Sequence, residues 1–299
     1  MIGSPAWRLA ACQYPIERLP DFSFYRRKME SWVNEAAAAG ARLLVFPEYA
    51  AMELTSLLAP RDRQDLRRQL DALQDFLPDF LDLCVVLAKK RGIHLVAPSF
   101  PVRMTGDAFR NRAHLMTPSG QIVFQDKLKM TRFESEQMGI SSGDALKIFE
   151  TPLGRIGVAI CYDAEFPHLA RAQSEAGADV ILVPSCTEHL SGHSRVWIGA
   201  RARALENQCI VAVSPTVGEA PWSIAIDHNV GAAGVFAPPD HGFSDDGVLA
   251  HGRLNAPAWV YADIDRQALD RLRQDPEVFI RRDWHQRADL MLDVACERL

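Results

Sequence analysis

The stretch from Gly154 to Pro167 reads Gly-Arg-Ile-Gly-Val-Ala-Ile-Cys-Tyr-Asp-Ala-Glu-Phe-Pro, and it decides how the rest of the chain is interpreted. Ile156 to Ile160 is a short apolar run, typical of a strand buried on both faces. Cys161 follows directly, then an acidic turn and a helical pattern from His168 to Gly177. A thiol at a sharp strand-to-helix turn is placed like a nucleophile, with backbone N–H groups nearby to face an oxyanion. On this stretch alone, a buried structural cysteine explains Cys161 equally well.

Length and composition restrict the class of protein. The 299 residues carry a net charge of −5 with dispersed Lys and Arg, which argues against nucleic acid or an anionic membrane as main partner. No apolar run approaches the roughly 20 residues of a membrane span, and residues 1–11 lack a signal-peptide pattern, so we expect a cytoplasmic location. No linker or repeat divides the chain. We therefore predict a single domain over 1–299, with a C-terminal helix and tail over 267–299.

The cysteines and histidines do not form a metal-binding pattern. The six cysteines are scattered without a CxxC pair, which favours reduced thiols over a disulfide framework: Cys12, Cys84, Cys161, Cys186, Cys209 and Cys296. His189 and His193 are four residues apart, as two ligands on one helical face would be. The intervening Ser191-Gly192 indicates a turn instead. We expect neither a metal nor a cofactor.

The apolar pattern predicts alternating strands and helices and hence an α/β fold. The strand count is high for one open sheet, so we expect two sheets packed together with helices outside. The segment 130–144 is expected to be an irregular loop. Strands are expected over 7–14, 43–46, 93–97, 112–117, 121–125, 156–160, 179–183, 210–214, 231–236 and 259–264, and helices over 24–39, 61–91 divided at Pro78, 168–177 and 195–207.

Three reactive side chains share one position in this pattern. Glu48, Lys127 and Cys161 each come directly after a predicted strand. Strand ends at one side of a sheet are where α/β active sites form, so we expect these side chains to converge. Taken singly, Glu48 is explained as a turn residue and Lys127 as a solvated surface lysine. Three unrelated structural roles do not explain why all three side chains follow strand ends. Their shared position favours a catalytic site.

A carboxylate, an ammonium and a thiol together can hydrolyse an amide without a metal. Glu48 accepts the thiol proton, and Cys161 attacks a carbonyl carbon to form a thioester. Lys127 and the N–H of Tyr162 stabilise the oxyanion. Glu48 then protonates the departing amine and later activates water.

These residues and their surroundings resemble the carbon–nitrogen hydrolases of the nitrilase superfamily. The resemblance runs from the first strand to about Asp263 and rests on residues 43–48 (LLVFPE), 126–131 (DKLKMT), 157–163 (GVAICYD), 184–185 (PS) and 202–207 (ARALEN). It implies a four-layer α-β-β-α sandwich that commonly dimerises through helices and the C-terminal tail, so we expect a homodimer or a higher homo-oligomer. It also implies Glu48 as general base, Lys127 as cationic stabiliser and Cys161 as nucleophile.

The resemblance further implies a second glutamate between the lysine and the cysteine. Glu134 lies seven residues after Lys127, the interval of the nitrilase-like pattern Lys-Leu-x-x-Thr-x-x-Glu, and Glu136 is the alternative. Lys129 competes with Lys127, but the Lys-Leu spacing and the preceding strand favour Lys127.

The residues after the cysteine indicate the branch and the substrate. Tyr162-Asp163 is similar to amidases and carbamoylases, whereas nitrilases typically have Trp-Glu, so we predict a small carboxamide and water as substrates. Carbamoylases tend to place arginines here, but this chain has Ala164-Glu165. Glu165 is expected either to meet a cationic substrate group or to cap the next helix. An N-carbamoyl amino acid hydrolase and a nitrilase are the alternatives.

Two further classes of protein are weaker explanations. A papain-like protease pairing Cys161 with His168 leaves the Glu and Lys unexplained. A catalytically retired binding scaffold leaves the intact Glu–Lys–Cys set unexplained.

Overall fold

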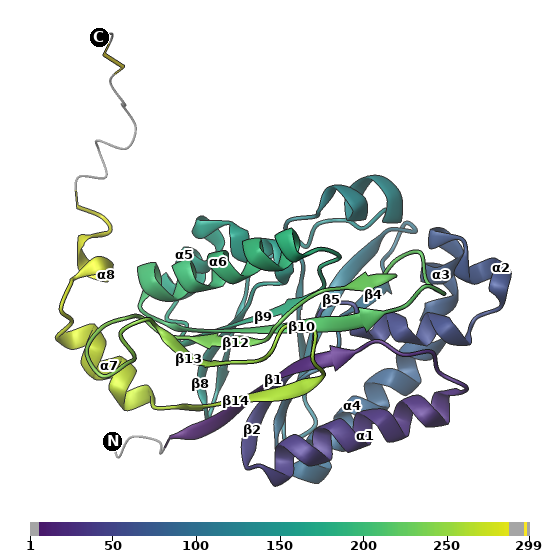
Figure 1. Ribbon diagram of the computed structural model, residues 1–299, viewed down its shortest axis with the longest axis horizontal. Coiled ribbons are helices and arrows are strands. Elements are labelled where there is room, and N and C mark those ends of the chain that lie inside the picture. The colour runs from purple at the N-terminus through teal and green to yellow at the C-terminus, as the bar shows by residue number, and fades with distance from the viewer. Residues whose placement is uncertain (1–5, 287–295, 298–299) are drawn as a thin grey trace.

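The computed structural model describes residues 6–286 and 296–297 (Figure 1). Its helices are α1 (Phe22–Ala38), α2 (Pro60–Arg63), α3 (Leu66–Leu73), α4 (Leu77–Arg91), α5 (Pro167–Glu175), α6 (Leu190–Asn207), α7 (Arg266–Gln274) and α8 (Ile280–Asp283), with 3-10 turns η1 (Ala50–Leu57), η2 (Gln74–Phe76) and η4 (Cys161–Glu165) and a π-helical turn η3 (Glu134–Met138). The short helix expected after residue 267 is α7. Most of the tail expected to follow it, residues 287–295 and 298–299, lies outside the described residues.

The strands form two sheets. They are β1 (Trp7–Pro15), β2 (Ala41–Val45), β3 (His94–Val96), β4 (Phe100–Arg103), β5 (Phe109–Met116), β6 (Ile122–Asp126), β7 (Ile148–Thr151), β8 (Gly154–Val158), β9 (Val180–Ser185), β10 (Ile210–Glu219), β11 (His228–Asn229), β12 (Gly234–Phe236), β13 (Val248–His251) and β14 (Ala258–Ile264). One sheet runs β6-β5-β3-β2-β1-β14, with β4 also paired to β5. The other runs β7-β8-β9-β10-β12-β13, with β11 also paired to β10. The ends of β1 and β10 pair in parallel and join them.

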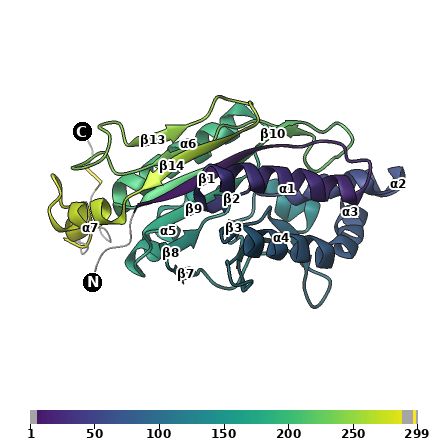
Figure 2. The same cartoon turned by 90° about the horizontal axis from the view of Figure 1, so that it is seen from below.

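The sheets pack face to face, with helices on both outer faces. Figures 1 and 2 show α1 and α4 covering the β1–β2 sheet, while α5 and α6 cover the β8–β9 sheet. Strand β1 shows how the sequence specifies this order. Leu9 and Ala11 pack with the second sheet, whereas Cys12 and Tyr14 pack with the side chains of α1. A strand covered on both faces must be apolar on both, which is why β1 lacks a polar side. The predicted four-layer sandwich is confirmed.

The structure corrects three details of the predicted elements. Segment 61–91 divides twice. The predicted division is present, because η2 separates α3 from α4 and Pro78 lies in the first turn of α4, where its missing N–H breaks no helical bond. A second break, missed from the sequence, comes at Asp65, which caps α3. Segment 130–144 contains the π-helical turn η3. Helix α6 starts at Leu190, so Ser191-Gly192 is helical and not a turn, and Gly192 lets that first turn pack closely on Thr187.

Within the described residues, no helix is long and apolar enough to cross a membrane. The expected cytoplasmic location stays a prediction.

Candidate active site

Glu48, Lys127 and Cys161 meet at the carboxyl ends of strands from both sheets. Glu48 follows β2, Lys127 follows β6, and Cys161 begins η4 after β8. Their exposed fractions are 1%, 1% and 4%. Lys127 Nζ lies 2.7 Å from Glu48 Oε1. The convergence expected from the strand ends is therefore present, and neither Glu48 nor Lys127 is a solvated surface residue.

Glu134 completes this cluster from the π-helical turn. Its Oε2 lies 2.6 Å from Lys127 Nζ and accepts hydrogen bonds from the N–H and hydroxyl of Thr131, both at 2.9 Å. Its Oε1 accepts the Tyr49 hydroxyl at 2.7 Å. Glu136 points away, with a side chain 57% exposed and paired with Arg132. The structure thus places Glu134, and not Glu136, against the lysine.

Asp163 holds the cysteine turn against the segment that carries Lys127. Cys161 adopts a left-handed backbone with φ of 49°. Two residues later, the buried Asp163 carboxylate accepts N–H groups of Leu128 and Lys129 across the site and of Ile160 before the cysteine, at 2.7–3.2 Å. These bonds offset the strained backbone at Cys161 and fix both reactive residues relative to each other.

Several residues that hold Glu48 and Glu134 were missed from the sequence. Asn111 Nδ2 donates to Glu48 Oε1 at 2.9 Å, and the backbone N–H of Cys186 donates to Glu48 Oε2 at 3.0 Å. Tyr49 and Thr131 bind Glu134. Only Thr131 carried a signal, as part of the Lys-Leu-x-x-Thr-x-x-Glu pattern. Nothing local distinguishes Asn111, which lies 63 residues from the carboxylate that it contacts.

The charges in this cluster control one another. Burial raises the pKa of Glu48 to about 7, against the opposing effect of the Lys127 ammonium. Burial also raises the pKa of the Cys161 thiol, and the negative charge of Glu48 adds to this. The pKa of Lys127 is raised despite burial because Glu134 and Glu48 stabilise its charge. Burial opposes ionisation of Glu134, but Lys127 and the hydrogen bonds hold its pKa below the usual value. Near neutral pH the site therefore holds a thiol, an ammonium, an ionised Glu134 and a Glu48 that is partly ionised.

The cluster opens into a cavity of about 550 Å³. Cys161 and Lys127 lie in its wall together with Tyr162 and Glu165, the two residues predicted to contact substrate. The cavity thus suits a small molecule.

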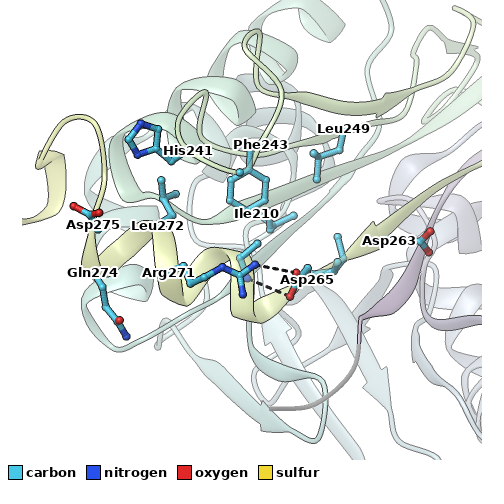
Figure 3. Close-up of a pocket in the computed structure, with 13 residues that line it drawn as sticks. Ile210, His241, Phe243, Leu249, Asp263, Asp265, Arg271, Leu272, Gln274 and Asp275 are labelled. Atoms are coloured by element: carbon cyan, nitrogen blue, oxygen red, sulfur yellow. Dashed lines mark hydrogen bonds and ion pairs between the residues drawn. The ribbon is translucent and has the colours of Figure 1, made fainter. Parts of the chain in front are cut away.

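A second cavity, of about 590 Å³, lies between the loop before β13 and the start of α7 (Figure 3). Arg271 and Asp265 form a 3.4 Å ion pair on its wall, and Phe243 and Leu272 supply apolar surface. It contains none of the candidate catalytic residues, which all lie in the wall of the first cavity.

The described residues hold no metal cluster at the candidate active site. Three residues elsewhere have side-chain atoms close enough together to hold one metal ion: Asp240, His241 and Glu277. They are outside the candidate active site and largely exposed. His189 is exposed, and His193 packs on Trp197 with ring centroids 5.2 Å apart.

Comparison with known proteins places this geometry in a family. The chain matches the family described as carbon-nitrogen hydrolase over residues 8–253. It belongs to the carbon–nitrogen hydrolases. The probable hydrolase YhcX of Bacillus subtilis (strain 168) is 34% identical to this hydrolase over 271 residues, covering 91% of this chain and 52% of YhcX. The chain thus spans about half the length of that relative. The omega-amidase NIT2 of Danio rerio is 28% identical, covering 90% of this chain and 91% of NIT2.

Solved structures of the nitrilase superfamily share the fold. The C. elegans NitFhit protein superimposes with a TM-score of 0.78 at 21% identity, covering 97% of this hydrolase and 67% of that chain. An amidase from Nesterenkonia sp. AN1, in which acrylamide has added to the active-site cysteine, gives 0.67 at 19% identity, covering 96% and 98%. The family and the fold class that the sequence predicted are both confirmed.

Proposed function

We propose that this carbon–nitrogen hydrolase is an amidase that releases ammonia from a small carboxamide through a thioester on Cys161. One observation carries the proposal: Lys127 bridges Glu48 and Glu134 at 2.7 and 2.6 Å, beside the cysteine and in the wall of a cavity. A buried thiol with no base beside it would be inert. Here a carboxylate that titrates near neutral pH lies next to it.

In the proposed mechanism Cys161 forms the covalent bond, Lys127 stabilises negative charge and Glu48 carries the proton in each step. Cys161 Sγ attacks the amide carbon as Glu48 accepts the thiol proton. The oxyanion meets the Lys127 ammonium and the N–H of Tyr162. Glu48 protonates the nitrogen, the C–N bond breaks and ammonia leaves. Glu48 then takes a proton from water, whose oxygen attacks the thioester carbon. The C–S bond breaks, the carboxylic acid leaves, and Glu48 returns the proton to the Cys161 sulfur.

The role of Glu134 in this scheme is positioning. It holds the Lys127 ammonium in place and balances the charge of the cluster, so that Glu48 does not have to neutralise the lysine alone. Without Glu134, Lys127 and Glu48 would form a closed ion pair and the base would be weaker.

Relatives support amide over nitrile hydrolysis. Omega-amidases are among them, and the Tyr162-Asp163 sequence agrees with that branch. An N-carbamoyl amino acid hydrolase and a nitrilase remain the alternatives within the family. The complete Glu–Lys–Cys arrangement speaks against a retired scaffold.

A substrate panel tests the proposed function. Purified enzyme is given aliphatic carboxamides, ureido acids and the matching nitriles, and ammonia release is measured. We expect release from carboxamides at rates well above those from ureido acids and nitriles. Ammonia from the nitriles alone, or from the ureido acids alone, would replace the amidase with one of the two alternatives.

The pH dependence of activity tests Glu48 as the base. Because the base must be ionised, kcat/KM should rise with pH through an apparent pKa near the value of about 7 set by burial of Glu48. The negative charge of Glu134 contributes to that raised pKa, so Glu134→Gln should shift the acidic limb to lower pH. The apparent pKa of this acidic limb describes the coupled carboxyl groups together and not Glu48 alone. It is measured from initial rates of ammonia release at each pH. If the acidic limb of Glu134→Gln lies at the same pH as in the wild type, Glu48 is not the base that this limb reports.

We further propose that the chain acts as one domain over 1–299 and forms a homodimer through α6 and the segment 267–299. Leu190, Ile198 and Leu205 on α6 are 55%, 67% and 43% exposed, which is a large apolar surface for one helix.

A further inference from the structure

The active-site cavity is lined by an excess of negative charge. Among the described residues, its wall holds five carboxylates and two permanent cations, Lys127 and Arg195. Lys127 is already shared between Glu48 and Glu134. Outside that cluster, the wall holds three carboxylates, Glu165, Glu188 and Asp227, against the one permanent cation of Arg195. His189 lies 3.5 Å from Glu188 and His228 lies 3.8 Å from Asp227, whereas Glu165 has no histidine partner among the described residues. A cavity lined with one sign of charge concentrates ligands of the opposite sign.

Glu165 is the most enclosed of these three carboxylates. Its side chain is 19% exposed, whereas Glu188 and Asp227 are 58% and 47% exposed. In the described part of the chain, its polar partner is Arg195 Nε at 3.4 Å, on a side chain that is itself 60% exposed. An ion pair this long and this exposed stabilises a carboxylate little. Glu165 is thus partly enclosed in the cavity wall with one weak partner, which leaves its carboxylate oxygens available to a cationic ligand.

The position of Glu165 relative to the nucleophile suits one end of a small substrate. Cys161 and Glu165 are the first and last residues of η4. At a 3-10 rise of about 2 Å per residue, they are separated by roughly 8 Å along the axis. Both face the same cavity. A short chain with its amide carbon at Cys161 can therefore carry its other end to Glu165.

We propose that the substrates of this hydrolase carry an ammonium or guanidinium group at the end opposite the amide, and that the Glu165 carboxylate binds that group. The inference rests on the proposed amidase function and adds the charge of the substrate to it. It sets this chain apart from a hydrolase with a cationic clamp after the cysteine, because Ala164-Glu165 supplies an acid at that place.

Three amides with matched chains test the inference. They are δ-aminovaleramide, which ends in an ammonium, valeramide, which is neutral, and glutaramate, which ends in a carboxylate. The expected order of kcat/KM is ammonium, neutral, carboxylate, with about 10- to 100-fold between the first two, as a charge-assisted hydrogen bond provides. The preference should shrink as salt is added. Hydrolysis of glutaramate in preference to the other two would overturn the inference and point to Arg195 as an anion site.

Glu165→Gln separates binding of the cation from a structural role. The ratio of kcat/KM between δ-aminovaleramide and valeramide should fall by about 10- to 100-fold, mainly through KM for the charged amide. Glu136→Gln is the matched control, because Glu136 is exposed on η3 and outside the cavity wall, and the ratio should not change. An equal loss on both amides in Glu165→Gln would show that the residue only supports the turn, which overturns the inference. Arg195→Met should keep or strengthen the preference, since it frees Glu165; loss of the preference would also overturn it.

Measuring binding to an inactive variant tests the charge preference independently of the amidase function. Cys161→Ala retains the cavity, so calorimetric binding of the three amides reports charge selection without turnover. Tighter binding of δ-aminovaleramide with no hydrolysis by the wild type would support the inference and reject the amidase. If the wild type hydrolyses the amides and neither turnover nor binding to Cys161→Ala depends on their charge, the amidase function is supported and the inference is rejected.

Discussion

Cys161→Ser abolishes amide hydrolysis and leaves the fold in place; this is the largest effect that we expect. The serine hydroxyl is a far weaker acid than a thiol, and a base with a pKa of about 7 cannot deprotonate it to a useful extent. We expect kcat to fall by at least about 10³-fold. The side chains are similar in size, so the buried site is repacked little.

Three measurements check this result. Ammonia release gives the rate, circular dichroism and thermal unfolding report the fold, and intact-mass spectrometry during turnover shows the acyl adduct on the wild type and its absence in Cys161→Ser. Cys296→Ser is the matched control, because Cys296 is an exposed thiol and its loss should change neither rate nor adduct. Appreciable turnover by purified Cys161→Ser would contradict the covalent mechanism.

We expect the second large effect from Lys127→Met, which should lower both the activity and the free energy of unfolding. Removing the ammonium leaves the Glu48 and Glu134 carboxyls buried with no cation between them. Losing one partner of a buried ion pair costs about 3–5 kcal/mol of the free energy of unfolding. Activity should fall by at least about 10³-fold because the oxyanion loses its charged donor.

The stability loss should depend on pH with a defined sign. In Lys127→Met, burial without a cation raises the pKa of both carboxyls above their unfolded values. Their protonated forms are then favoured in the folded state, so stability is kept below the unfolded pKa of about 4.3 and is lost as pH rises through the folded values. The difference from wild type in urea unfolding should therefore be small near pH 5 and large near pH 8.

Two further variants make this prediction specific. Lys129→Met removes a neighbouring ammonium that lies 5.3 Å from the Phe166 ring and outside the cavity wall, and it should keep activity and stability close to wild type. The double variant Lys127→Met/Glu134→Gln removes one of the two stranded carboxylates, so it should regain part of the stability and none of the activity. Loss of activity in Lys129→Met, with activity retained in Lys127→Met, would reverse the choice between the two lysines.

Local patterns predicted the parts of the site that lie at strand ends. Glu48, Lys127 and Cys161 each follow an apolar run, and a strand end is a property of a few consecutive residues. The two-sheet architecture was also predictable, because strands buried on both faces read as continuous apolar runs. Glu134 was implied by the family resemblance, through the interval of its Lys-Leu-x-x-Thr-x-x-Glu pattern, although the π-helical turn that carries it was expected to be irregular loop.

Only the tertiary structure decided which distant residues hold these groups in place and what else the cavity presents. Asn111 and the N–H of Cys186 reach Glu48 from elements 63 and 138 residues away, and Arg195 meets Glu165 across 30 residues. No local pattern encodes such pairs, because polar side chains at these positions are equally compatible with solvent. The sequence by itself determined the fold and indicated the candidate reacting groups, because strands buried on both faces are continuous apolar runs and each candidate group directly follows one. The charge of the base and of the cavity is set by burial and by contacts between the two sheets, so it exists only in the folded chain.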